Sequence, residues 1–267
     1  MYWRRIVPVE VRHEFRGKRG SPALVFSGSL GTDLTMWEPQ AERLKPRFCT
    51  LRYDLRGHGA SPVPPGPYSI ADLGGDLLAL LDRLGIERAS LSGLSIGGMI
   101  SMWVAAHAPE RVDRLVLCCT SAQLGPREGW IERAATVRAD GVGAIADAVL
   151  GRWFTPAFAA AHPDVIERMR GILSSTDREG YAGCCEAIAD MDLRDAITSI
   201  TAPTLVIAGA DDPATPPEHG RLIADLIPGA RFEVISPAAH LATIERPDLT
   251  TAMILRFLSE SEEGSDR

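Results

Sequence analysis

The feature of this chain that most constrains its fold is the segment Gly93-Leu94-Ser95-Ile96-Gly97-Gly98. It has the G-x-S-x-G form in which a strand turns abruptly into a helix with a serine at the apex. The turn forces the serine into a strained backbone conformation, so its neighbours must be small, and the three glycines meet that need. The run 89–92 predicts the strand, and the largely apolar run 99–108 predicts the helix. Since the motif alone also arises by chance in glycine-rich loops, its meaning depends on partner residues further along the chain.

Strand and helix patterns alternate on both sides of this turn. The run 23–26 is continuously apolar, as in parallel strands that are buried on both faces. In residues 70–84 leucine and isoleucine recur at a three-to-four spacing, with Ser69 as N-cap and Gly85 as C-terminal stop, which predicts a helix. Residues 3–16 hold two short alternating runs that predict a hairpin. The remaining predicted strands are 48–53, 112–119, 204–208 and 231–235, and the remaining helices are 35–44, 218–227 and 248–258.

The alternation stops between residues 121 and 200. No strand-like run occurs there, and helical patterns occupy 130–139, 144–150, 165–173 and 181–190. A helical block inserted into such an alternation is best explained as a cap over the carboxyl edge of the sheet. We therefore expect a core made of residues 1–120 and 201–259, a helical cap at 121–200, and a disordered acidic tail at 260–267.

Composition limits the partners of the chain. The 267 residues are 45% hydrophobic and 24% charged, which is enough for a large buried core. The net charge of −7 is modest and spread along the chain, which argues against nucleic acid or an acidic membrane surface as partner. No apolar run approaches the roughly 20 residues that span a bilayer, and no export signal is recognisable. We expect a cytoplasmic protein that acts on a small molecule, and we infer no obligate protein partner.

The cysteines point to the same compartment. Their number is odd, no two have the C-x-x-C spacing, and three lie in predicted strands. Buried free thiols in a reducing cytoplasm explain this pattern better than a disulfide framework or a metal site. The five are Cys49, Cys118, Cys119, Cys184 and Cys185.

A serine nucleophile needs a base within hydrogen-bond reach and a third group that orients the base. With a turn of this type the order along the chain is serine, acid, histidine. Asp211 and Asp212 both follow a predicted strand; we choose Asp212, because the usual loop is Gly-x-x-Asp and a proline after the acid fixes the turn. Asp211 is interpreted as a turn residue. His240 is the predicted base, because it alone of the six histidines follows the acid in a loop between a strand and a closing helix. His58 lies upstream of the serine and is assigned a structural role in its loop.

Acyl transfer puts negative charge on the carbonyl oxygen in the transition state, and this charge needs preorganised donors. We expect the backbone N–H of Ile96, directly after the nucleophile, to be one donor. The other should come from the loop 27–31 after the first parallel strand. We predict the Leu30 N–H, with Ser29 as the alternative.

With these residues placed, the chain resembles the α/β-hydrolase superfamily along its whole length. Within the superfamily it is similar to the 3-oxoadipate enol-lactonases. The turn, the acid and the base specify only the superfamily, whereas the strings in the predicted cap are more specific, because caps shape the substrate pocket. The likeness is carried by residues 29–34, 36–37, 51–54, 56–59, 61–68, 93–99, 152–156, 181–185 and 212–217.

The resemblance implies an α/β-hydrolase fold, with a mostly parallel eight-stranded sheet flanked by helices and an inserted helical cap. It implies a five-membered enol lactone bearing a carboxymethyl group as substrate, 3-oxoadipate as product, and a place in the β-ketoadipate pathway of aromatic degradation. Ser95 would attack the lactone carbonyl, His240 would take its proton and Asp212 would hold the imidazole, while Ile96 and Leu30 bind the oxyanion. This chemistry requires no metal and no organic cofactor.

The substrate carboxylate needs a cation or several hydrogen-bond donors near the pocket. The predicted cap contains six arginines, and the sequence does not choose among them. Our candidates for substrate contacts are Ser29, Trp130, Arg133 and Trp153. The six arginines are Arg127, Arg133, Arg138, Arg152, Arg168 and Arg170.

Two positions depart from the family pattern. Gly28 stands where asparagine is common, so we expect a more mobile oxyanion loop, and Ile96 replaces a frequent methionine, a minor change because only its N–H is used. Two other interpretations stay open. One is another cofactor-free serine hydrolase of this fold, such as a general esterase, a perhydrolase or a C–C bond hydrolase. The other is a non-catalytic binding module, against which the intact serine, acid and histidine weigh heavily.

Overall fold

The computed structural model describes residues 7–18 and 20–260. In these residues seven strands form one sheet in the order β1-β3-β2-β4-β5-β6-β7. Strand β1 runs antiparallel to β3, and all other neighbours are parallel. The strands are β1 (His13–Arg16), β2 (Ala23–Ser27), β3 (Cys49–Tyr53), β4 (Ala89–Leu94), β5 (Val112–Cys118), β6 (Thr204–Gly209) and β7 (Arg231–Ile235).

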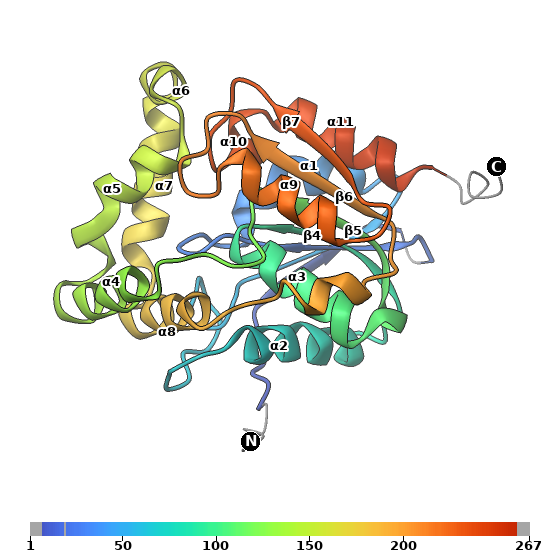
Figure 1. Ribbon diagram of the computed structural model, residues 1–267, viewed down its shortest axis with the longest axis horizontal. Helices are drawn as coiled ribbons and strands as arrows, with labels where there is room; N and C mark the ends of the chain where they lie inside the picture. The colour runs from blue at the N-terminus through green and yellow to red at the C-terminus, as the bar shows by residue number, and fades with distance from the viewer. Residues whose placement is uncertain (1–6, 19, 261–267) are drawn as a thin grey trace.

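Helices cover both faces of the sheet. Helices α2 (Ile70–Arg83) and α3 (Ile96–His107) pack together on one face, and α1 (Glu38–Leu44) and α11 (Pro247–Leu258) pack together on the other (Figure 1). Helix α9 (Pro217–Leu226) packs on β6 and β7. The expected α/β architecture is thus confirmed, and no helix among the described residues is long and apolar enough to cross a membrane.

The expected eighth strand is absent from the described residues. Within residues 7–18 of the two N-terminal runs, only β1 forms a strand. The Val9 N–H donates to the Asp76 carboxylate at 2.8 Å, and the Arg12 N–H donates to the Ser61 hydroxyl at 2.9 Å. These amides are therefore satisfied by side chains and not by a neighbouring strand. Residues 3–6 of the predicted hairpin and residues 261–267 of the predicted tail lie outside the described residues.

Helix α2 shows how local sequence sets the element boundaries. Ser69 and Asp72 form a reciprocal capping box at its start. At its end Gly85 has a φ of +66°, and the Ile86 N–H donates to the Leu81 carbonyl at 2.9 Å. This is the hydrogen bond of a Schellman motif, in which glycine takes the left-handed conformation without steric cost. The predicted helix and both of its ends are confirmed.

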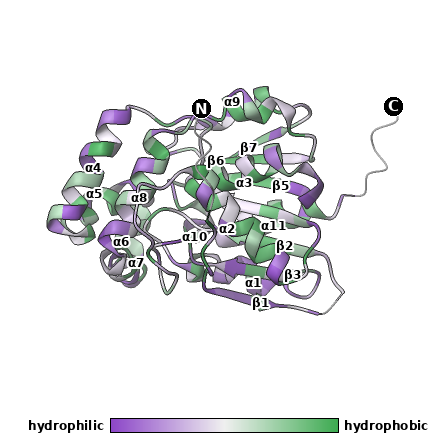
Figure 2. Cartoon of the chain, turned by 90° about the horizontal axis from the view of Figure 1, so that it is seen from below, coloured by the Kyte–Doolittle hydropathy of each residue, from purple (hydrophilic) through white to green (hydrophobic). Residues whose placement is uncertain are grey.

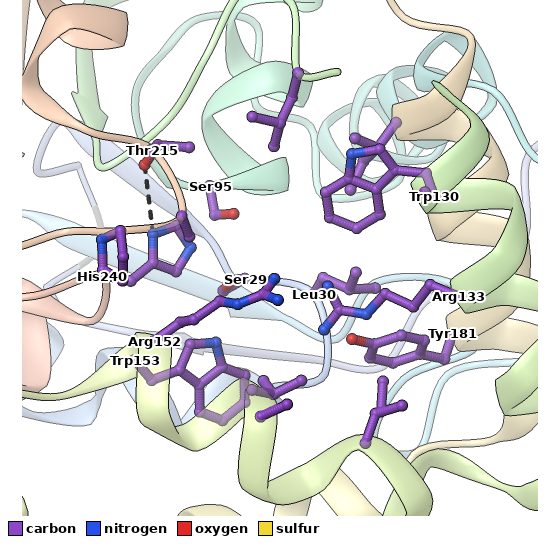
Figure 3. Close-up of a pocket in the computed structure, with 18 of the residues that line it drawn as sticks. Ser29, Leu30, Ser95, Trp130, Arg133, Arg152, Trp153, Tyr181, Thr215 and His240 are labelled. Atoms are coloured by element: carbon purple, nitrogen blue, oxygen red, sulfur yellow. Dashed lines mark hydrogen bonds between the residues drawn. The ribbon is translucent and has the colours of Figure 1, made fainter. Parts of the chain in front are cut away.

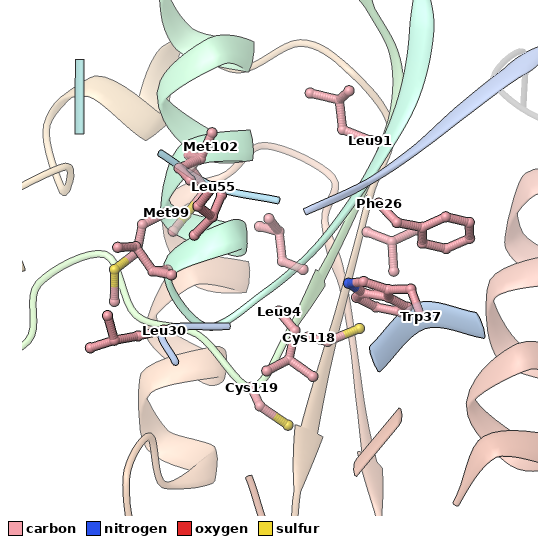
Figure 4. Close-up of a cluster of buried hydrophobic side chains, with 14 of the residues drawn as sticks. Phe26, Leu30, Trp37, Leu55, Leu91, Leu94, Met99, Met102, Cys118 and Cys119 are labelled. Atoms are coloured by element: carbon pink, nitrogen blue, oxygen red, sulfur yellow. The ribbon is translucent and has the colours of Figure 1, made fainter. Parts of the chain in front are cut away.

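The core lies between the sheet and its helices. Strands β2, β4 and β6 are buried at almost every position. In Figure 2 much of the hydrophobic colour lies on the sheet and on the helices packed against it. Phe26 and Trp37 pack with ring centroids 4.9 Å apart. Leu94 and Met99 lie on either side of Ser95 in the chain and belong to the same buried cluster (Figure 4). The turn that carries Ser95 therefore stands on a tightly packed base.

Between β5 and β6 the chain forms a block of helices beside the sheet (Figure 1). Short α6 was not predicted, and the only strand-like feature here among the described residues is an isolated bridge between Gln123 and Asp192. The block comes very close to the core at Gly57 and Gly180, where a Cβ on Gly57 would lie 2.2 Å from the Gly180 Cα. The helices are α4 (Arg127–Asp140), α5 (Ala146–Trp153), α6 (Pro156–Ala161), α7 (Pro163–Ser175) and α8 (Arg178–Ala189).

Candidate active site

Ser95 occupies the single residue between β4 and α3. Its φ of 57° and ψ of −121° are strained for a residue with a side chain. The turn closes because Gly93 and Gly97 have no Cβ: one on Gly93 would lie 2.2 Å from the Gly97 carbonyl oxygen, and one on Gly97 would lie 2.2 Å from that of Ser27. The Ser95 N–H donates to the Cys118 carbonyl at 3.0 Å. The sharp turn predicted from the glycines is therefore present.

Asp212 follows β6, and its carboxylate is fully engaged. One oxygen accepts the backbone N–H groups of Ala214 and Thr215 at 2.8 and 3.0 Å, and the other accepts the Thr215 hydroxyl at 2.8 Å and His240 Nδ1 at 2.8 Å. Burial alone would raise the pKa of Asp212, but the charge of His240 and these hydrogen bonds lower it below its ordinary value. The carboxylate is thus ionised and points its charge at the imidazole.

Neighbouring Asp211 is arranged differently. Its side chain is exposed, and its carboxylate accepts the Ala238 N–H at 3.2 Å. Of the two adjacent carboxylates, Asp212 is the one that contacts His240, as the sequence predicted.

The loop that carries His240 is anchored on both sides. The Ala239 N–H donates to the buried carboxylate of Glu245 at 3.0 Å, and the Leu241 N–H donates to the Trp153 carbonyl at 2.9 Å. Glu245 also accepts a hydrogen bond from the Thr155 hydroxyl. Since Trp153 and Thr155 belong to the inserted helical block, the position of His240 depends on that block as well as on the sheet.

Ser95 and His240 open into one cavity of about 530 Å³, within the usual range for sites that bind small molecules. Figure 3 shows both side chains facing the same space, with Thr215 above the imidazole and a dashed line joining the two. In the described part of the chain no hydrogen bond joins the Ser95 hydroxyl to His240. Such bonds are often long in unliganded enzymes and tighten when substrate binds.

The loop after β2 offers a free amide to this cavity. The Ser29 N–H donates to the Met36 sulfur at 3.2 Å, and the Gly31 N–H donates to His58 Nε2 at 3.0 Å. The Leu30 N–H between them has no partner within residues 7–18 and 20–260. This pattern favours Leu30 over Ser29 as the second oxyanion donor.

The first amide of α3 is the other free donor. The Ile96 N–H stands directly after Ser95 at the helix N-terminus and also lacks a partner among the residues described. The partial positive charge of a helix N-terminus favours an anion there. At Gly28 a Cβ would lie 3.1 Å from the Thr32 hydroxyl oxygen and 3.2 Å from the Met36 sulfur, so a larger side chain would crowd them. The greater mobility expected from Gly28 stays a prediction.

All four residues proposed from sequence as substrate contacts reach the cavity. Ser29 lies on the sheet side, and Trp130, Arg133 and Trp153 come from α4 and α5 (Figure 3). Arg152 lines the same cavity, whereas the other four arginines of the predicted cap do not. No group of His, Cys, Asp and Glu side chains in the described ranges is arranged to hold a metal ion.

Three residues of the site were not singled out from the sequence. Thr215 donates to Asp212 and lies 3.4 Å from His240 Nδ1, Glu245 anchors the histidine loop, and Tyr181 lines the cavity from α8. Thr215 could have been found, because a threonine three residues after a turn aspartate is a common partner of its carboxylate. For Glu245 the bond to the nearby Ala239 amide is local, but the bond to Thr155, 90 residues away in the chain, leaves no signal in the local sequence.

Comparisons with known proteins show what the chain is similar to. The family model of the α/β hydrolase fold matches residues 22–143 and 157–247. The 3-oxoadipate enol-lactonase 2 of Acinetobacter baylyi is 42% identical over 231 residues, which cover 86% of each chain. The 3-oxoadipate enol-lactonase 1 of the same organism is 37% identical over 235 residues, or 88% of each chain. The crystal structure of the enol-lactonase from Burkholderia xenovorans LB400 matches with a TM-score of 0.93 and 45% identity, covering 94% of this chain and 97% of that one.

Proposed function

Because this chain belongs to the α/β-hydrolase fold family, we propose that it is a serine hydrolase that opens an enol lactone, with the activity of a 3-oxoadipate enol-lactonase in the β-ketoadipate pathway of aromatic degradation. The observation that carries the chemistry is that Ser95 and the hydrogen-bonded pair His240–Asp212 meet at one cavity. The similarity to two enol-lactonases over more than four fifths of the chain supports the choice of substrate.

In the first half-reaction the Ser95 hydroxyl attacks the lactone carbonyl, while His240 Nε2 accepts its proton. Asp212 holds Nδ1 of the imidazole, which fixes its orientation and stabilises the imidazolium that forms. The ring C–O bond then breaks, and the departing enolate takes the proton from His240. The enol is a better leaving group than an alkoxide, and it tautomerises to a ketone that cannot readily close the ring again.

In the second half-reaction water attacks the acyl-serine, with His240 as base, and the same histidine returns the proton to Ser95. The product is 3-oxoadipate. In both tetrahedral intermediates the oxyanion is stabilised by the N–H groups of Leu30 and Ile96, which make no backbone hydrogen bond in the described residues. Nucleophile, base, orienting acid and oxyanion donors are thus all groups of this chain.

The helical block is proposed to act as a cap, residues 121–200, over a core of residues 1–120 and 201–259. It supplies Trp130, Arg133 and Trp153 to the cavity wall. Since the serine, acid and histidine are common to many hydrolases, specificity for a small anionic lactone rests on this cap.

The reducing cytoplasm is the proposed compartment. All five cysteines are free and buried, including the neighbouring pair Cys184 and Cys185 on α8. Thiols kept in this state are typical of proteins in reducing compartments.

The test is the disappearance of the enol lactone on addition of the purified protein, compared with hydrolysis of a simple aryl ester. We expect the lactone to have the larger kcat/KM. A larger value for the aryl ester would favour a general esterase. Hydrolysis of neither substrate, together with failure of a fluorophosphonate probe to label Ser95, would favour a binding module.

A further inference from the structure

We propose that Arg133 and the Tyr181 hydroxyl form a carboxylate-binding subsite that holds the acidic arm of the substrate. The inference rests on the proposed function in one respect, that the ligand is a lactone carrying a free carboxylate. In Figure 3 the two side chains lie together on the side of the cavity opposite His240. Arg133 comes from α4 and Tyr181 from α8, two helices that pack along each other.

The charge of Arg133 has no partner in the described chain. Three other cap arginines are engaged in ion pairs: Arg127 with Asp190, Arg138 with Glu179 and Glu186, and Arg170 with Asp147. Half-buried Arg133 lies instead over two aromatic rings, with its Cζ 5.2 Å from the Trp130 ring centre and 5.4 Å from that of Tyr181. The two rings hold the guanidinium in place without neutralising it. A cation held in a cavity without a counterion is arranged to receive an anion.

Tyr181 supplies an unused polar atom at the same place. The residue is 0% exposed, and its hydroxyl is one of the few buried side-chain oxygens in the described chain without a hydrogen-bond partner. An unsatisfied buried hydroxyl is costly, and this one belongs to a residue that lines the cavity beside the Arg133 guanidinium, so it is available to a carboxylate that Arg133 binds. Burial also raises the pKa of Tyr181, and the neutral hydroxyl remains a donor at neutral pH. One carboxylate can accept from both groups.

Two other charged residues line the cavity and fit this role less well. Arg152 enters from α5 but is exposed, so water already solvates its charge and screens it. Glu132 is an exposed carboxylate of α4 and makes no ion pair with Arg133 in the part of the chain described. Of the two arginines in the cavity, Arg133 is the one held between aromatic rings and beside an unsatisfied donor.

A separate anion subsite also solves an orientation problem. The substrate carries a permanent carboxylate and develops a second negative charge at the lactone carbonyl during the reaction. Without a competing cation, the carboxylate could occupy the free N–H groups of Leu30 and Ile96 and block the reaction. Arg133 draws the carboxylate away from Ser95, which leaves these amides for the oxyanion.

The experiment compares two substrates with the same ring. One is the carboxymethyl enol lactone, and the other is 5-methyl-2(3H)-furanone, in which a methyl group replaces the acidic arm. The variants are Arg133→Gln, Tyr181→Phe and Arg152→Gln, with Arg170→Gln as a control that removes the same charge from a surface ion pair. We expect Arg133→Gln to lower kcat/KM for the carboxylated lactone roughly 10- to 100-fold, and Tyr181→Phe about 3- to 10-fold, since hydrogen bonds to charged groups are lost. The neutral lactone should change less than about twofold in every variant.

Parallel loss of both activities in Arg133→Gln and Tyr181→Phe would overturn the subsite while leaving the proposed function intact, as would a larger selective loss in Arg152→Gln. If the parent protein opens neither lactone, the proposed function fails. The subsite is then tested separately, by measuring the affinity for adipate by calorimetry. Weaker adipate binding to Arg133→Gln than to the parent and to Arg170→Gln supports the subsite. Equal binding to all three overturns it. Thermal melts of each variant confirm that the compared proteins are folded.

Discussion

His58 Nε2 accepts a hydrogen bond from the Gly31 N–H at 3.0 Å, and this bond ties a fully buried histidine to the residue next to Leu30. Because Nε2 accepts, Nδ1 carries the proton and donates to the Arg56 carbonyl at 3.1 Å. Burial lowers the pKa of His58, in keeping with a neutral ring. The structural role expected from sequence therefore takes a specific form, in which His58 is a positioning residue for the loop that presents the Leu30 amide.

Replacing His58 should impair turnover more than binding. His58→Leu leaves Gly31 without its acceptor, so the Leu30 amide is no longer held for the oxyanion. Loss of one oxyanion donor costs roughly 10²–10³-fold in kcat, and a donor that is only displaced should cost about tenfold or more. KM should change little. His58→Gln can still accept from Gly31 and should recover part of kcat. Equal kcat in the parent, His58→Leu and His58→Gln, once each is shown to be folded, would mean that His58 only packs in its loop and does not position the Leu30 amide.

The same histidine should make stability depend on pH. Its pKa is lowered in the folded protein, whereas in the unfolded chain it is about 6.5. As the pH falls below this value, the unfolded chain binds a proton that the folded protein does not bind, so stability is present above about pH 6.5 and is lost below it. Between pH 7.5 and 5 the melting temperature of the parent protein should fall more than that of His58→Gln. Parallel curves for the two proteins would contradict this.

Ser95→Ala should abolish turnover of both lactones. The loss expected for removal of a serine nucleophile is roughly 10⁶-fold in kcat. Neither Ser92, buried in β4, nor Ser101, which donates to the Gly97 carbonyl at 2.8 Å, opens into the cavity, and neither can replace it. Ser101→Ala is the matched control and should keep its activity and its labelling by a fluorophosphonate. Activity near that of the parent in Ser95→Ala would remove the proposed mechanism.

Asp212→Asn and Asp211→Asn separate the two neighbouring acids. An amide at position 212 cannot fix the tautomer of His240, and the expected cost is about 10⁴-fold in kcat. In the described residues the exposed Asp211 side chain makes one hydrogen bond, from the Ala238 amide, so its replacement should cost little. The measurement is the steady-state kcat of each purified variant. A larger loss of kcat in Asp211→Asn than in Asp212→Asn would assign the orienting role to Asp211.

The positions of Ser95, Asp212 and His240 could be predicted because each depends on local sequence. Glycines allow the turn at Ser95, and the other two residues follow strands whose apolar runs are unmistakable. The choice among the arginines could not be made, because it depends on contacts between α4 and α8. Arg138, for example, is not available to a substrate carboxylate because it pairs with Glu186, which is 48 residues away in the chain. In the described residues the sheet has seven strands and not the expected eight, and there the Val9 amide bonds to Asp76, 67 residues away, and not to another strand.

The five thiols should be inert in the folded protein. All are buried. Burial raises the pKa of Cys118 and of Cys185 to about 12, so almost none of the thiolate form of these two exists at neutral pH. Cys119, close to Asp212, has its pKa raised well above its ordinary value, first by burial and then by the charge of that carboxylate. Iodoacetamide at pH 7.5 should therefore leave intact mass and activity unchanged, whereas the same treatment in denaturant should add five carbamidomethyl groups. Rapid modification of the native protein at any cysteine would show that this part of the core opens to solvent. If activity is lost at the same rate as the cysteine is modified, that cysteine lies in a segment that must stay packed for catalysis. Peptide mapping would identify the cysteine, and Cys119, directly after β5, would be examined first.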